Sequence, residues 1–308
     1  MIKTKPYYDF GDFLKKYFPF KVQKIAVNGG FTCPNRDGSI GYGGCTYCNN
    51  QTFHPGYCLP TKSITRQLEE GIRFFARKYP EMKYLAYFQA YTNTYDSLEH
   101  LKRKYEEALA YPGVVGLIIG TRPDCMPDEL LDYLSEKSKH YFILIEYGIE
   151  STSDATLIRI NRGHTFQTAV KTIRRTVQKG ILNGVHLILG LPGEDRSLIL
   201  SHAHRISELP VNTLKLHQLQ IIRGTAMAKE YAVHPERFQL FTPEEYASLI
   251  IEFTERLRPD IAIDRFISQS PKELLIAPDW GLKNFEFTAL VNKQFEKRKT
   301  KQGALYLL

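Results

Sequence analysis

The feature that most constrains the fold is an alternation of short apolar runs with longer amphipathic stretches through most of the 308 residues. Several apolar runs are nearly continuous, such as Gly116-Leu-Ile-Ile, which is typical of parallel strands buried on both faces. We predict strands at residues 24–31, 83–89, 114–120, 141–149, 184–191 and 213–222. We predict helices at 63–79, 96–111, 127–138, 165–179 and 195–208, with Ser63, Asp96 and Thr165 as N-caps and Gly180 as a stop. Such a chain is expected to form an α/β fold, a partial (β/α)6 TIM-type barrel, open or closed.

Beyond about residue 235 the pattern changes. A helix is expected near 242–258, followed by the run Ile261-Ala-Ile-Asp-Arg-Phe and, after several Pro and Gly residues, a last helix. We therefore divide the chain into a barrel at 1–235 and a C-terminal α/β extension at 236–308, which is expected to contact substrate or RNA. Residues 283–301 carry six Lys or Arg against two Glu, so the last helix is equally well explained as a solvated surface or a nucleic-acid contact.

The charge balance permits a polyanionic partner. There are 41 Lys and Arg against 33 Asp and Glu, a net charge of +8, which allows nucleic acid without requiring it. The chain has no run of the roughly 18 apolar residues that span a membrane, and its N-terminus has no apolar core of a signal peptide. We therefore expect no membrane contact and a cytoplasmic location.

Four of the five cysteines fall between positions 33 and 58. Cys33, Cys45 and Cys48 form the spacing C-x11-C-x2-C, directly after the first predicted strand and among six glycines. An odd number of cysteines in a chain of this kind argues against a disulfide framework and for metal binding or catalysis. Because loops after strands form the active-site face of a β/α barrel, this loop is the expected site of chemistry.

Three interpretations of these cysteines compete. A tetrahedral zinc site would need a fourth ligand, which His54 or Cys58 could supply. Buried, inert thiols are disfavoured because a glycine-rich loop offers little apolar surface to pack against them. A [4Fe–4S] cluster bound by three cysteines would leave one iron without a protein ligand, where a substrate or cofactor can bind.

The cysteine spacing, with aromatic Tyr47 before the last cysteine, resembles the radical SAM superfamily, and within it the branch similar to Elongator subunit 3. Further segments extend the resemblance over almost the whole chain: NRDG at 35–38, YFQAYTNT at 87–94, IGTRPDC at 119–125, INRGH at 160–164, GVHLILGLPGE at 184–194 and LKLH at 214–217. The resemblance implies an enzyme that cleaves S-adenosylmethionine (SAM) with an electron from the cluster. The resulting 5′-deoxyadenosyl radical takes hydrogen from the substrate.

The resemblance implies that Cys33, Cys45 and Cys48 ligate the cluster and that SAM chelates the open iron. It implies SAM contacts from Tyr47, Gln89, Ala90, Thr92, Glu150, Arg162 and His186. A guanidinium such as that of Arg162 suits the SAM carboxylate, and the carboxylate of Glu150 suits ribose hydroxyls. Judged from the residues alone, an ordinary surface ion pair is the alternative for Glu150 and Arg162, and a core histidine is the alternative for His186.

Cys125, His217 and Arg223 follow strands and are our candidates for substrate contact. The Elongator-like resemblance implies a tRNA substrate, with a carboxymethylaminomethyl group on the wobble uridine converted towards aminomethyl. It also implies a reducing partner such as flavodoxin or ferredoxin. Two alternatives remain at this point: a radical SAM enzyme for a small metabolite or a protein, and a non-catalytic metal-binding RNA adaptor.

Overall fold

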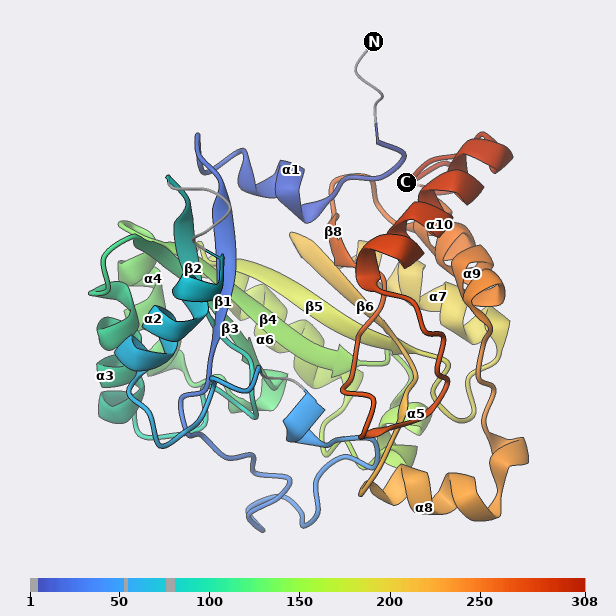
Figure 1. Ribbon diagram of the computed structural model, residues 1–308, viewed down its shortest axis with the longest axis horizontal. Helices are drawn as coiled ribbons and strands as arrows, with labels where there is room; N and C mark the ends of the chain where they lie inside the picture. Colours follow the sequence, from blue (N-terminus) through green and yellow to red (C-terminus); the bar gives the residue numbers. More distant parts are fainter. Residues whose placement is uncertain (1–4, 53–54, 76–80, 308) are drawn as a thin grey trace.

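The computed structural model describes residues 5–52, 55–75 and 81–307. At its centre is a curled sheet with the strand order β1-β2-β3-β4-β5-β6-β8, in which every neighbouring pair is parallel (Figure 1). The strands are β1 (Val22–Val27), β2 (Lys83–Phe88), β3 (Val114–Thr121), β4 (Phe142–Glu150), β5 (Leu182–Leu189), β6 (Thr213–Gln218) and β8 (Ala262–Arg265). The first six follow one another in chain order, which confirms the predicted partial barrel.

Helices connect successive strands and pack on the outer face of the sheet. The predicted ones are α2 (Ile64–Phe75), α3 (Leu98–Leu109), α4 (Asp128–Ser138), α6 (Phe166–Gln178), α7 (Arg196–Ser207), α9 (Pro243–Arg256) and α10 (Asn284–Arg298). Thr165 caps α6 as expected, and Gly180 turns the chain after it with φ +72°. The cap of α3 is Ser97 instead of Asp96, because the Ser97 side chain accepts the hydrogen bond from the His100 amide. Among the α-helices of the described residues, three were not predicted: α1 (Phe10–Leu14), α5 (Asp154–Arg159) and α8 (Ala226–Val233).

Two predicted strands end earlier than their apolar runs. Strand β1 stops at Val27 because the amide of Asn28 donates to the side chain of Gln67 at 2.7 Å and no longer to a strand. The predicted strand 213–222 divides after Gln218 into β6 and the short β7 (Ile221–Ile222). Strand β7 pairs antiparallel with β9 (Leu275–Ala277) outside the barrel.

The barrel interior is closed at one end by α1. Phe10 and Phe13 of this helix are buried in one apolar cluster with Leu85, Ile118 and Phe142, the last being the first residue of β4. The rings of Phe13 and Phe142 lie 6.4 Å apart, edge to face. Figure 1 shows α1 crossing one end of the curled sheet, while the loop after β1 lies at the other. Among the described residues, α1 thus covers the end where the strands begin, and the opposite end is the one to search for a site.

The C-terminal segment contributes to the barrel itself. Strand β8 pairs with β6, and α9 packs against α7 and α10. Trp280 stacks on Phe287 of α10 with ring centroids 5.5 Å apart. Of the helices in the described part of the chain, none has the length and apolar character needed to cross a membrane.

Candidate active site

A cavity opens where the barrel strands end. It is lined by ten residues that the sequence indicated: Cys33, Cys45, Tyr47, Cys48, Gln89, Thr92, Glu150, Arg162, His186 and His217. These residues come from the loop after β1, from the C-terminal parts of β2, β4, β5 and β6 or just beyond them, and, for Arg162, from the turn after α5. The fold thus brings residues that are distant in sequence to one space.

The cysteine loop is held in place by contacts to two segments far along the chain. The amide of Thr46 donates to the carbonyl of Ile160 at 3.0 Å, and its carbonyl accepts from the amide of Met227 at 2.8 Å. Gly44 has φ +83°, and a Cβ there would lie 2.9 Å from the guanidinium of Arg36. The left-handed backbone conformation therefore favours glycine at this position, and a side chain there would displace the Arg36 guanidinium.

Side-chain N–H groups point at two of the cysteine sulfurs. Arg162 Nη1 lies 3.5 Å and Asn35 Nδ2 3.6 Å from Cys45 Sγ, and Asn50 Nδ2 lies 3.5 Å from Cys48 Sγ. Burial raises the pKa of the Cys48 thiol to about 11. Such a thiol is deprotonated only by a nearby positive centre such as iron, and N–H donors to sulfur are a recurrent means of tuning Fe–S clusters. The donor set therefore fits a cluster.

The zinc alternative fails for its candidate fourth ligand Cys58. The Cys58 thiol is buried away from the cavity and donates to the carbonyl of Ala26 at 3.0 Å. His54 lies outside the described residues.

Glu150 and Arg162 form an ion pair inside the cavity and not on the surface. Their charged atoms lie 3.6 Å apart, with the side chains 12% and 7% exposed. Arg162 also donates to the carbonyl of Gly148, while its Nε is buried with no partner among the described residues. A guanidinium with an unused buried N–H facing a cavity can bind an added carboxylate.

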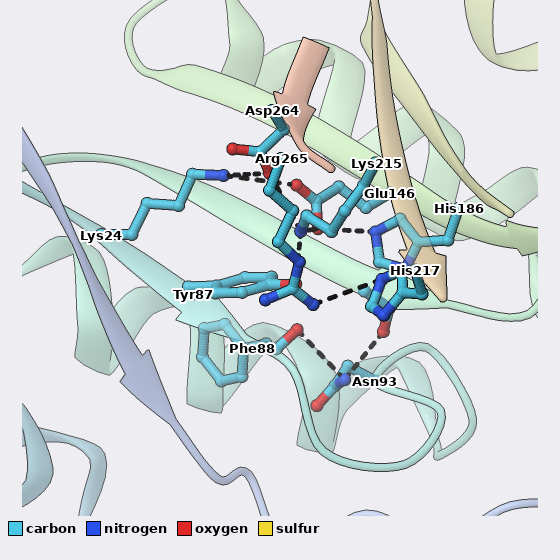
Figure 2. A network of polar contacts seen from close by, with 11 residues as sticks. Lys24, Tyr87, Phe88, Asn93, Glu146, His186, Lys215, His217, Asp264 and Arg265 are labelled. Atoms are coloured by element: carbon cyan, nitrogen blue, oxygen red, sulfur yellow. Dashed lines mark hydrogen bonds and ion pairs between the residues drawn. The ribbon is translucent and has the colours of Figure 1, made fainter. Parts of the chain in front are cut away.

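The loop after β2 is held from below by Asn93. Its Nδ2 donates to the carbonyls of Phe88 at 3.2 Å and Gly120 at 2.7 Å (Figure 2). This keeps Gln89 and Thr92 at the cavity wall, while Ala90 between them is 1% exposed and does not line the cavity.

A buried charge network lies below the cavity, and we did not predict it from the sequence. Lys215 Nζ of β6 lies 2.6 Å from Glu146 of β4 and 3.1 Å from Asp264 of β8. Lys24 of β1 lies 2.7 Å from Asp264, so the network joins the two edge strands of the open sheet (Figure 2). Single charged residues within otherwise apolar strands were the sequence feature that could have indicated this network.

The two histidines border this network. His186 Nε2 lies 3.0 Å from Glu146, and burial together with the charge of Lys215 lowers the pKa of His186. His217 Nε2 lies 3.2 Å from Arg265 Nη2, and burial and the Arg265 charge hold the pKa of His217 well below its usual value. Both rings are therefore neutral near pH 7.

Two of the candidates lie elsewhere. Cys125 lines a separate surface hollow together with Thr94 and Asp124, and burial raises its pKa to about 12. The Arg223 side chain is exposed and donates to the carbonyl of Glu273 at 3.3 Å. The carbonyl of Arg223 accepts from Asn49 at 3.1 Å, so its backbone supports the cysteine loop.

Comparison with known proteins identifies the family. The model of the radical SAM superfamily matches residues 30–206, more than half of the chain, and that of the radical SAM C-terminal domain matches 211–297. The uncharacterized protein YtqA of Bacillus subtilis is 34% identical over 98% of this chain and 93% of its own length.

Two archaeal proteins are more distant. A tRNA uridine(34) acetyltransferase of Methanocaldococcus jannaschii is 27% identical over 61% of this chain and 34% of its own length. The solved structure of Methanocaldococcus infernus Elp3, with an N-terminal deletion, shares the fold with a TM-score of 0.66 at 16% identity. That match covers 91% of this chain and 64% of the archaeal one. The chain belongs to the radical SAM superfamily, whose enzymes use a [4Fe–4S] cluster and S-adenosylmethionine.

Proposed function

We propose that this radical SAM enzyme acts on tRNA and converts a carboxymethylaminomethyl group at C5 of the wobble uridine into an aminomethyl group. The observation that carries the proposal is a single cavity in which three cysteine thiols, the Glu150–Arg162 pair and further arginines face the same space. The likeness to a tRNA uridine(34) acetyltransferase supports a tRNA uridine as the substrate.

The cavity residues divide into cluster and SAM contacts under this proposal. Cys33, Cys45 and Cys48 hold the cluster, and Arg162, which touches Cys45, receives the SAM carboxylate. Other residues that line or adjoin the cavity contact the rest of SAM. Tyr47 lies at the adenine, Glu150 and His186 at the ribose, and the backbone of Gln89, Ala90 and Thr92 at the amino group. When bound, the cluster and SAM supply a 5′-deoxyadenosyl radical, and a one-electron donor such as flavodoxin or ferredoxin starts the reaction.

The proposed reaction balances without another oxidant. With the cluster and SAM bound, the CH2 group between the amine and the carboxylate would be oxidised by two electrons, one leaving with a hydrogen atom to the 5′-deoxyadenosyl group and one returning to the cluster. Water then hydrolyses the carbon–nitrogen double bond, releasing glyoxylate and leaving the aminomethyl group on the uridine. The other products are methionine and 5′-deoxyadenosine, and the electron supplied at the start is recovered.

The charge of the cavity favours an anionic substrate. Four arginines and two glutamates line it: Arg36, Arg122, Arg162, Arg265, Glu146 and Glu150. The basic end of α10 lies elsewhere, because Phe295 packs on Tyr7 near α1, at the closed end of the barrel (Figure 1). The arginines of the cavity, and not this helix, therefore support RNA binding at the site.

Tyr91 offers a surface for a flipped base. It lines the cavity and is 39% exposed, with φ +64°, and its amide donates to Asn50 Oδ1 at 2.9 Å. Asn50 also contacts Cys48, so the Tyr91 backbone is fixed relative to the cluster loop. Aromatic side chains commonly stack on splayed bases of single-stranded RNA loops.

The test is anaerobic turnover of the reconstituted enzyme with dithionite, SAM and tRNA carrying carboxymethylaminomethyluridine. We expect 5′-deoxyadenosine and aminomethyluridine to form together, and neither to form with Cys45→Ala. Formation of 5′-deoxyadenosine without any change in the tRNA would contradict the substrate and favour a metabolite or protein. A protein that binds RNA but forms no 5′-deoxyadenosine, despite a full cluster, would instead be a metal-binding adaptor.

A further inference from the structure

Arg265 at the end of β8 is a cation inside the cavity without an acidic partner among the described residues. Its one hydrogen-bonded contact there is Nη2 to His217 Nε2 at 3.2 Å, and its Nε is buried and unpartnered. The neighbouring Asp264 does not serve it, because that carboxylate lies 2.7 Å from Lys24 and 3.1 Å from Lys215. Figure 2 shows the Arg265 guanidinium turned away from Asp264 and towards His217.

The charges around Arg265 leave it as the surplus. Lys24 and Lys215 are matched by Glu146 and Asp264, so the network beneath is neutral without it. Both cavity histidines are neutral near pH 7, for the reasons given above. Since His217 Nε2 accepts from Arg265, the ring carries its proton on Nδ1. Arg265 is half-buried with a buried Nε, and a partly desolvated guanidinium without a counter-ion is unfavourable, so this position suits an anion from a ligand.

We propose that Arg265, supported by His217, binds the carboxylate of the carboxymethylaminomethyl group, an inference that rests on the proposed function. Its planar fork matches a carboxylate with two parallel hydrogen bonds. We assign the SAM carboxylate to Arg162 because Arg162 contacts the cluster ligand Cys45, whereas Arg265 contacts His217 on β6. A backbone phosphate is less suited, because Arg265 stands on a barrel strand among interior side chains, where a flexible arm on a flipped base can reach.

This assignment makes Arg265 the residue that determines specificity. Holding the carboxylate fixes the adjacent CH2 group, from which hydrogen is taken, relative to the cluster loop across the cavity. The aminomethyl product lacks the carboxylate and loses this contact. Substrate and product then differ in affinity through one residue.

The test compares two synthetic anticodon stem-loop RNAs that differ only in carrying carboxymethylaminomethyluridine or aminomethyluridine. Binding to the reconstituted, SAM-loaded protein is measured by fluorescence anisotropy. We expect the wild type to prefer the carboxylate-bearing RNA roughly ten- to a hundredfold, as for a charge-assisted bidentate contact. Arg265→Gln should bring this ratio close to one, and Arg265→Lys, which keeps the charge without the fork, should lose part of it. Arg103→Gln, at an exposed position on α3, is the matched control.

Two results would overturn the assignment. One is a preference retained by both Arg265 variants, and the other is loss of SAM binding by Arg265→Gln in the absence of RNA, which would give this residue to the cofactor. The proposed function fails separately, if the wild type converts neither a tRNA nor a stem-loop that carries the carboxymethylaminomethyl group. Should Arg265→Gln not fold, the ratio measured for Arg265→Lys decides the question, and an unchanged value refutes the proposal.

Discussion

Replacing Lys215 by Met tests whether the buried network holds the barrel together. Lys215 and Glu146 are 4% and 2% exposed at a distance of 2.6 Å, and Lys215 Nζ also donates to the hydroxyl of Tyr87 at 2.9 Å. Removing one partner of a buried pair leaves an uncompensated charge, and such changes destabilise by about 3–5 kcal/mol. With an unfolding entropy of about 2.1 cal/mol/K per residue over 308 residues, the expected fall in Tm is about 5–8 °C.

The assay is anaerobic scanning calorimetry of the reconstituted protein. Lys139→Met is the matched control, because Lys139 and Glu136 form an ion pair whose side chains are 60% and 70% exposed. It should change stability by less than about 1 kcal/mol. The double variant Lys215→Met with Glu146→Gln should recover part of the loss, since it leaves no unpaired carboxylate. A Tm for Lys215→Met equal to that of Lys139→Met would refute the reasoning.

Two further predictions concern single side chains. Arg162→Gln should keep the cluster absorbance but weaken SAM binding roughly ten- to a hundredfold, because the SAM carboxylate loses its bidentate contact with the guanidinium. Equilibrium dialysis measures the affinity for SAM, and an unchanged affinity would contradict the role assigned to Arg162. Burial raises the pKa of Cys58 from 9.0 to about 12, so the folded state holds this proton more tightly than the unfolded state does. The stabilisation is complete below pH 9 and is lost as the pH rises towards 12. In urea titrations over that pH range, the unfolding free energy should fall with pH less steeply for Cys58→Ala than for the wild type, by about 1.4 kcal/mol per pH unit. The same slope in both proteins would show that the Cys58 thiol does not cause the fall.

The barrel was predictable because its strands are marked by local composition. Continuous apolar runs such as that of β4 can only be buried on both faces, and the helical stretches between them supply the cover. The end of β1 was not predictable in the same way. Asn28 leaves the sheet because it bonds to Gln67, a contact formed only after α2 has packed on the strand.

The residues of the site that stand in recognisable sequence motifs were predictable. The cysteines, Glu150 and Arg162 stand in recognisable segments, and they line the same cavity. Arg265 stands in no such segment, and its importance appears only when β8 pairs with β6 and brings it beside His217. Partners brought together by the pairing of strands that are distant in sequence leave no local pattern in the sequence.

The central claim, that the substrate CH2 group gives its hydrogen to the 5′-deoxyadenosyl group, can be measured directly. The reconstituted enzyme is given SAM, reductant and a stem-loop whose carboxymethyl CH2 group carries deuterium, and the 5′-deoxyadenosine is analysed by mass spectrometry. The account predicts one deuterium in 5′-deoxyadenosine, formed together with aminomethyluridine. Aminomethyluridine formed with unlabelled 5′-deoxyadenosine would contradict the account.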